Sequence, residues 1–125
     1  MRVFLAGSTG AVGRHLVPLL QQAGHFVIGT TRSREKAEHL KAQRVDAIIL
    51  DALDRQATVR AVVQAQPDAI VHQMTAIPGD MNLRRFDREF ELTNRLRREG
   101  TDNLLHAART AAVTRLVAQS FGGWT

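Results

Sequence analysis

Three glycines near the start of the chain constrain its fold more than any other feature. Gly7, Gly10 and Gly13, in "GSTGAVG", follow the short apolar run "RVFLAG" and open a segment with apolar residues at helical spacing, namely Val12, Leu16, Leu19, Leu20 and Ala23. Glycines between a strand and a helix let backbone N–H groups approach phosphate oxygens, and the helix N-terminus adds partial positive charge. We therefore expect a phosphate-binding loop; a purely structural turn is the alternative.

Short apolar runs and helical patterns alternate along the rest of the chain. The pattern predicts strands at 2–7, 25–31, 45–51, 68–74 and 115–120, and helices at 11–24, 33–43, 54–66 and 86–112. Ser33 is the expected cap of the second helix, and Pro67 ends the third. Alternating strands and helices indicate an α/β fold, here a doubly wound parallel sheet in the order 3-2-1-4-5 with helices on both faces. We expect a single domain spanning residues 1–125.

Composition excludes several classes of protein. Hydrophobic residues make up 44% of the 125 residues, and no apolar stretch approaches the roughly 20 residues that span a bilayer. The chain lacks cysteine, and its five histidines show no metal-ligand spacing. These features predict a cytoplasmic protein with no membrane partner, no metal and no thiol nucleophile.

The net charge of +5 points to a small phosphorylated ligand and not to nucleic acid. Arginines account for nearly all of the 17 basic residues, but they are spread along the chain, and aromatic residues are only 5%. Nucleic-acid sites combine a basic stripe with aromatic residues that stack on bases. A scattered basic surplus favours a phosphorylated small molecule.

The glycine spacing and a later segment resemble one known family. G-x-x-G-x-x-G, with Thr9 before Gly10, is similar to the short-chain dehydrogenase/reductase superfamily in its extended, epimerase/dehydratase-like form, and "NRLRREGTDNLLHAAR" is similar to that family's N-x-x-G-T-x-N-L-L-x-A-A. At one position the chain departs from the family, since Arg97 stands where an asparagine usually supports the active site. The resemblance implies an NAD(P)-binding Rossmann domain, with contacts from the loop residues Gly7, Thr9, Gly10, Ala11, Val12 and Gly13.

The end of the second strand predicts which dinucleotide binds. An NAD site would carry an acidic residue there to accept hydrogen bonds from the adenine ribose. The sequence instead reads "GTTRSR", which places Arg32 where the 2′-phosphate of NADP would bind. Arg34 could contribute to the same contact. We expect NADP in preference to NAD; the alternative is that both arginines are ordinary solvated residues at a helix start.

Two more contacts are implied by the resemblance. Asp51 is expected to accept a hydrogen bond from the adenine amino group while the backbone of Ala52 lies beside the ring; the alternative for Asp51 is a cap on the following helix. "VHQMTA" aligns with the family's H-x-A-A, which places Gln73, Met74 and Thr75 near the nicotinamide-side ribose, largely through backbone atoms. His72 is expected to be a packed structural residue and not a proton shuttle.

The family's catalytic pair is missing from this sequence. Family members use a Tyr-x-x-x-Lys pair as acid and base, and a serine that matches Ser120. The chain contains no tyrosine, and its lysines, Lys36 and Lys41, both lie in the predicted second helix. We expect a chain that ends before the catalytic helix and substrate domain and is inactive by itself.

Two accounts of function remain open. The first is the NAD(P)-binding portion of an epimerase, dehydratase or reductase that transfers hydride to or from a small carbonyl, hydroxyl or nucleotide-sugar substrate. The alternative is a non-catalytic NADP-binding or redox-sensing module. An uncovered fifth strand also predicts self-association, for example a homodimer.

Overall fold

A five-stranded parallel sheet forms the centre of the computed structural model, which describes residues 1–10, 12–73, 91 and 94–118. The strands follow the order β3-β2-β1-β4-β5, which confirms the predicted topology. Their bounds are β1 (Arg2–Ala6), β2 (Phe26–Thr31), β3 (Asp46–Ile49), β4 (Ala69–His72) and β5 (Leu116–Ala118). The helices are α1 (Gly13–Gln22), α2 (Arg34–Ala42), α3 (Arg55–Ala65) and α5 (Thr101–Thr110), together with a π-helical turn, η1 (Leu96–Gly100).

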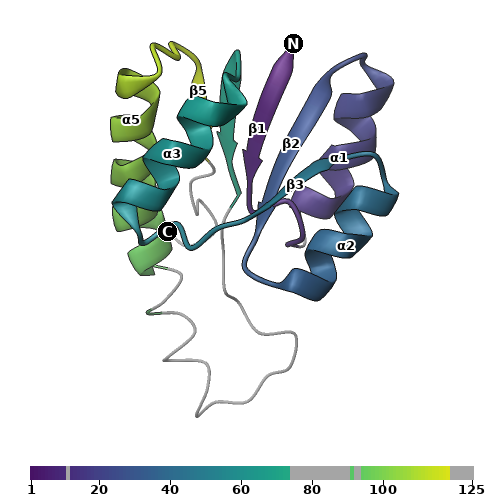
Figure 1. Cartoon of the computed structure of the whole chain (residues 1–125), viewed down its shortest axis with the longest axis horizontal. Helices are drawn as coiled ribbons and strands as arrows, with labels where there is room; N and C mark the ends of the chain where they lie inside the picture. Colours follow the sequence, from purple (N-terminus) through teal and green to yellow (C-terminus); the bar gives the residue numbers. More distant parts are fainter. Residues whose placement is uncertain (11, 74–90, 92–93, 119–125) are drawn as a thin grey trace, which may run out of the picture.

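Helices cover both faces of the sheet, which is why the central strands read as continuous apolar runs. Figure 1 shows α1 and α2 on one side and α3 and α5 on the other. Successive residues of β1 enter opposite cores: Phe4 packs with residues of α3 and α5, and Leu5 packs with residues of α1 and α2. Both side chains are fully buried. The two cores fix the strands, and therefore the loops at their ends.

The helix boundaries follow local capping signals. The Ser33 hydroxyl accepts a hydrogen bond from the Lys36 amide at 3.2 Å, which confirms the predicted cap of α2. α3 ends at Gln66, whose φ of 47° lies in the left-handed region just before Pro67. In α1 the apolar spacing was an imperfect guide, because Val17 is the buried core residue and Leu19 remains 59% exposed.

The predicted helix over residues 86–112 is partly wrong. Residues 86–90 lie outside the described residues, and the helix ends at Thr110. Between these points it is interrupted by η1, where one turn is wound more loosely. The carbonyl of Leu96, the first residue of η1, lies 3.2 Å from Nε2 of His72, so a tertiary contact accompanies the distorted turn.

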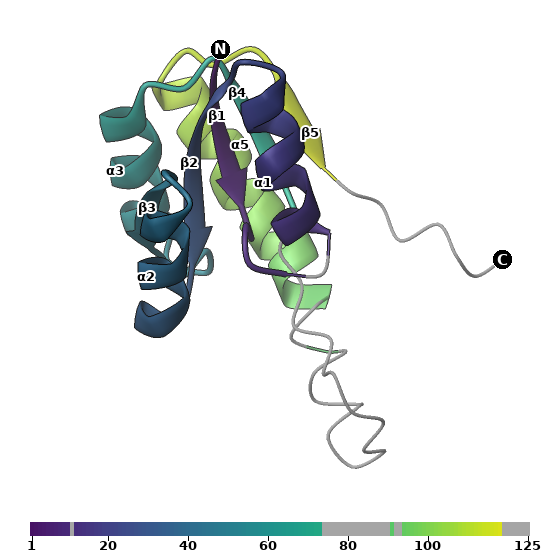
Figure 2. The same cartoon turned by 90° about the vertical axis from the view of Figure 1, so that its right-hand side faces the viewer.

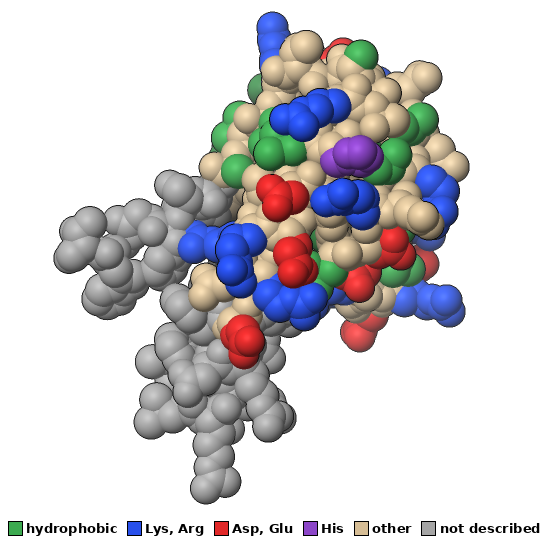
Figure 3. Space-filling model, turned by 90° about the vertical axis from the view of Figure 1, so that its left-hand side faces the viewer, with side chains coloured by type: hydrophobic (Ala, Val, Ile, Leu, Met, Phe, Trp, Pro, Cys, Tyr) green, Lys and Arg blue, Asp and Glu red, His purple; other side chains and the backbone are tan. Residues whose placement is uncertain are grey.

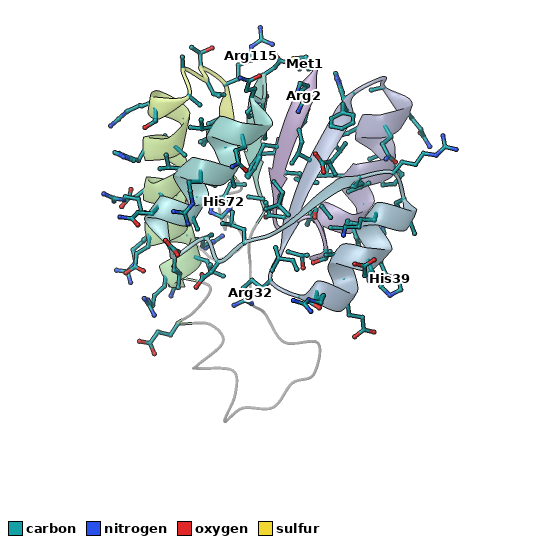
Figure 4. All side chains as sticks on the ribbon, in the orientation of Figure 1. Met1, Arg2, Arg32, His39, His72 and Arg115 are labelled. Carbon is teal, nitrogen blue, oxygen red and sulfur yellow. The ribbon has the colours of Figure 1, made fainter. Side chains whose placement is uncertain are left out.

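The carboxyl ends of all five strands point to one end of the molecule. Figure 2 shows the loop after β1 at that end. In Figure 4, Arg32 lies there as well, whereas Met1, Arg2 and Arg115 lie at the opposite end. Arg2 closes that opposite end, because its Nη2 donates to the Ala65 carbonyl at 2.7 Å where α3 stops. The end with the β1 loop is therefore the candidate functional end.

Candidate functional site

Two glycines of the β1–α1 loop are required by backbone geometry. Gly7 has a φ of 85°, which side chains rarely adopt. At Gly13, an added Cβ would lie 2.1 Å from the Gly7 carbonyl oxygen and 3.0 Å from Cα of Ser8. The N-terminus of α1 therefore approaches the end of β1 as closely as its backbone allows. Ala11 lies outside the described residues.

The loop leaves several backbone amides open to a ligand. The Gly7 amide donates to Oγ1 of Thr30 at 3.1 Å, and the Ser8 amide donates to the Thr30 carbonyl at 3.1 Å. Within the part of the chain that the structure describes, no hydrogen-bond acceptor meets the amides of Thr9, Val12 and Gly13. α1 also begins without a side-chain cap and without an acidic residue in its first turn. An open helix N-terminus beside a glycine turn can hold an anion.

The loop is fastened to β2 by residues that sequence reasoning missed. The hydroxyl of Ser8, itself fully buried, donates to the Thr30 carbonyl at 3.0 Å. Gly29 makes this contact possible, since a Cβ there would lie 2.6 Å from Oγ of Ser8. A glycine inside a strand pattern signals such a close approach, so Gly29 was recognisable in the sequence.

Hydroxyl groups occupy the end of β2, where an NAD site would carry a carboxylate. Oγ1 of Thr31 lies 3.1 Å from Oγ1 of Thr9 and accepts a longer hydrogen bond, 3.3 Å, from the Ser33 amide. Arg32 and Arg34 follow, and both side chains are exposed. The structure therefore brings the loop residue Thr9 and the two arginines to the same end of the sheet.

The loop after β3 presents Asp51 to solvent. Its Oδ1 accepts from the Leu53 amide at 3.0 Å, so the carboxylate braces its own loop. The cap of α3 is a different residue, Asp54, which accepts from the Ala57 amide at 3.1 Å. The helix-cap alternative for Asp51 is therefore wrong. Ala52 is buried, and its carbonyl accepts a 2.7 Å hydrogen bond from Asn103 of α5, a contact that sequence reasoning also missed.

The end of β4 holds a buried polar atom without a partner. The Gln73 amide donates to the Ala6 carbonyl at 2.8 Å and extends the sheet by one residue. Its side-chain Oε1 is buried, and no hydrogen-bond donor among the described residues reaches it. Buried polar atoms without partners are rare in proteins, and each one calls for an explanation such as a functional role or a bound water or ion. The other predicted residues of this region, Met74, Thr75 and Ser120, lie outside the described residues.

His72 faces the opposite side of β4 from Gln73 and is 4% exposed. Burial lowers the pKa of His72; the hydrogen bond to the Leu96 carbonyl raises it by less, and the Arg97 guanidinium adds the smallest effect, which lowers it. A neutral imidazole at this position packs against η1. The geometry favours a structural role for His72.

The outer face of α3 and α5 carries charges of both signs. Figure 3 shows basic and acidic side chains interspersed with hydrophobic ones on this face. At η1, Arg95 and Glu99 form a 3.1 Å ion pair, and both are about half exposed. Among residues 1–10, 12–73, 91 and 94–118, no helix is long and apolar enough to cross a membrane. The same residues contain no cluster of three or more His, Cys, Asp or Glu suited to a metal ion.

Fold and site together define a class of protein. In a parallel sheet of this order, the strand order reverses between β1 and β4, and ligands of doubly wound folds bind outside the carboxyl ends of the strands at such a point. The glycine loop and the orphaned Gln73 oxygen both lie at this position. The arrangement is that of a dinucleotide-binding Rossmann domain.

Comparison with known proteins identifies the family. Residues 3–120 match the NAD dependent epimerase/dehydratase family, and the chain belongs to it. It is 46% identical over 122 residues to the 3-diazoavenalumate denitrifying reductase of a Streptomyces species, an alignment that covers 96% of this chain and 38% of the relative.

Solved structures share the fold. UDP-glucose-4-epimerase from Stenotrophomonas maltophila, with bound NAD and formylated UDP-arabinopyranose, superposes with a TM-score of 0.76 at 22% identity, covering 98% of this chain and 37% of that one. The yeast methylglyoxal/isovaleraldehyde reductase complexed with NADPH gives a TM-score of 0.77 at 24% identity, covering 96% and 37%. The chain thus spans little more than a third of the length of these relatives.

Proposed function

We propose that this chain is an NADP-binding module of the reductase type. The observation that carries the proposal is the β1–α1 loop, in which two glycines are required by geometry and the amides of Thr9, Val12 and Gly13 meet no acceptor among the described residues. Open amides at the start of an uncapped helix suit a pyrophosphate, which brings negative charge and many acceptor oxygens.

The remaining residues at this end fit the other parts of a dinucleotide. Asp51 and Ala52 would hold the adenine, and Gln73, with Met74 and Thr75, would lie at the nicotinamide-side ribose. A ribose hydroxyl can donate a hydrogen bond, and the buried Gln73 Oε1 is an acceptor that no described donor reaches. This contact would come from the side chain, because the Gln73 amide is already bonded to β1.

The preference for NADP rests on the end of β2. A carboxylate there would repel a 2′-phosphate, whereas this chain offers the hydroxyls of Thr9 and Thr31 beside the exposed guanidinium of Arg32. The NADPH bound by the yeast reductase of the same fold agrees with this preference, and the NAD bound by the epimerase illustrates the alternative.

The bound cofactor would supply a hydride. We propose that the protein of full family length passes this hydride to a small carbonyl compound, because the 46% identical relative is a reductase by name. Epimerase or dehydratase chemistry on a nucleotide sugar is the second candidate, favoured by the fold neighbours. The present chain contains no tyrosine, so we propose that it holds the dinucleotide without supplying the acid and base. Of the family's catalytic residues, we propose that this chain supplies Ser120, which would contact the substrate. A cytoplasmic location and self-association stay predictions.

Calorimetric titration of the chain with NADPH and with NADH tests the proposal. Arg32→Ala is expected to weaken NADPH binding by about 1.5–3 kcal/mol, roughly tenfold to a hundredfold in Kd, and to leave NADH unchanged. Lys41→Ala is the matched control, because it also removes one positive charge from the α2 region but lies in the last turn, beside Glu38. It should alter neither ligand.

Each outcome has a distinct meaning. Absence of binding by both dinucleotides to the folded chain would refute the proposed function. Equal binding of both, with no effect of Arg32→Ala, would refute the preference for NADP and retain the dinucleotide site.

A further inference from the structure

Asn103 connects α5 to the loop after β3. It is 5% exposed, and both ends of its side-chain amide are hydrogen bonded. Nδ2 donates to the Ala52 carbonyl at 2.7 Å, and Oδ1 accepts from Nε of Arg55 at 3.0 Å. A buried amide with both partners satisfied is a rigid connection, because breaking either bond leaves a buried polar group unpaired.

Apart from the burial of Ala52 in the core, few other hydrogen bonds hold this loop in place. The Leu50 amide bonds to the Thr31 carbonyl and fixes the end of β3. After it, the hydrogen bonds of Asp51 are internal to the loop, since its side chain accepts from the Leu53 amide and its carbonyl from the Asp54 amide. Among the described residues, hydrogen bonding from residues 51–53 to the rest of the molecule runs through the Ala52 carbonyl.

We infer that Asn103 is a positioning residue for the adenine half of the cofactor. The inference rests on the proposed function, in which Asp51 and Ala52 receive the adenine. The side chain of Asn103 hydrogen bonds to Ala52 and Arg55 and not to Asp51; it fixes the Ala52 carbonyl, and Asp51 is the residue next to Ala52. A long-range contact from α5 thereby sets where the Asp51 carboxylate meets the base.

Arg55 and the Ala52 carbonyl together determine which way the Asn103 amide faces. A guanidinium nitrogen donates only, so the atom it meets must be Oδ1, and the NH₂ group then points to the Ala52 carbonyl. Asn103→Asp would keep the acceptor for Arg55 but would set a carboxylate oxygen against a carbonyl oxygen. Arg55→Met would keep the Asn103–Ala52 contact and remove one of the two groups that orient the amide.

The test compares two ligands that differ at one group of the base. NADPH carries a 6-amino group, which can donate a hydrogen bond to the Asp51 carboxylate. The reduced form of nicotinamide hypoxanthine dinucleotide phosphate carries a 6-oxo group, to which a carboxylate has no proton to donate. The wild-type chain should bind NADPH about tenfold more tightly than the analogue. Asn103→Leu and Asn103→Asp should bring this ratio close to one, and Arg55→Met should lower it partway.

Leu104→Val is the matched control, because Leu104 is the next residue of α5, is fully buried and takes no part in the loop contact. It should lower stability while keeping the tenfold ratio. A merely structural role for Asn103 would weaken both ligands equally and keep the ratio, which would overturn the inference.

Two further results separate this inference from the proposed function. A wild-type chain that binds both ligands equally would overturn the inference and leave the dinucleotide site standing. A wild-type chain that binds neither would refute the proposed function itself. Arg55 is exposed, so Arg55→Met keeps the test decisive if the Asn103 variants do not fold.

Discussion

Replacing Gln73 by leucine should change stability and binding in opposite directions. Leucine is one atom shorter than glutamine and branches at Cγ instead of Cδ, and it carries no polar atoms. The buried Gln73 Oε1 has no donor within the part of the chain that the structure describes, and an unsatisfied buried acceptor costs about 1–3 kcal/mol of folding free energy. Gln73→Leu removes that cost, so the ligand-free chain should gain about 1 kcal/mol of stability.

The same substitution should weaken cofactor binding. If the ribose hydroxyl donates to Oε1, losing that bond costs about 0.5–1.5 kcal/mol, roughly two- to twelvefold in the Kd for NADPH. Urea unfolding measures the first effect and calorimetric titration the second. Gln64→Leu is the matched control, since Gln64 is exposed on α3, and neither quantity should change by more than a few tenths of a kcal/mol.

Two results would contradict the reasoning. A less stable Gln73→Leu chain would mean that the amide makes favourable contacts in the ligand-free protein. A more stable chain with unchanged affinity for NADPH would mean that the orphaned oxygen lies away from the cofactor, and the nicotinamide half of the site would have to be built from other residues.

Two further predictions concern the loop and the buried histidine. Gly13→Ala must move backbone by at least 0.9 Å to relieve a contact of 2.1 Å, since Cβ contacts below 3.0 Å essentially never occur. The overpacking should lower the free energy of unfolding by about 1–3 kcal/mol, which exceeds the gain of about 0.5–1 kcal/mol from the better helix propensity of alanine. NADPH affinity should fall at least about tenfold. Gly24→Ala, at a φ of 90° but in open space, should cost about 1–2 kcal/mol in urea unfolding without changing that affinity. The pKa of His72 is lower in the folded chain than in the unfolded chain, where it is about 6.5, so the unfolded chain takes up the proton first as pH falls. The free energy of unfolding should therefore decrease as pH drops below that value. Urea unfolding at successive pH values should show a smaller decrease for His72→Gln.

The outcomes that oppose these two predictions are equally definite. A Gly13→Ala chain with wild-type stability and affinity would mean that the loop is not tightly packed in solution. A pH profile that His72→Gln does not alter would mean that the histidine is not held neutral by burial.

The strand positions were predictable because each depends on a local pattern, and the strand order followed from the general rule that strand–helix–strand connections are right-handed. β2 (Phe26–Thr31) falls inside the expected 25–31, and β4 (Ala69–His72) inside 68–74, since a strand buried on both faces is a short apolar run whatever its neighbours are. Ser33 was recognisable as a cap for a similar reason, because capping involves only the first turn of one helix.

Features that depend on distant contacts were not predictable. Nothing in "LRREG" distinguishes a π-helical turn from an α-helical one, and the turn is accompanied by a contact with His72, 24 residues earlier. In "DALD" both aspartates have the chemistry of a cap, and only the structure assigns that role to Asp54. Leu19 belongs to the apolar spacing of α1, yet Val17 is the residue that faces the sheet.

The candidate site divides along the same line. Residues expected to touch the cofactor come from short motifs: the glycine loop, the arginines after β2 and the aspartate after β3. Residues that hold those motifs in place come from elsewhere. Thr30 fixes Gly7 and Ser8, and Asn103 fixes the loop of Asp51 by its hydrogen bond to Ala52, which lies 51 residues earlier in the sequence. Supporting contacts of this kind join a hydroxyl or an amide to a backbone group, so many sequences can satisfy them. Motif comparison therefore identifies the ligand class, whereas affinity and specificity depend on the supporting residues, and these are the positions where substitutions should separate one family member from another.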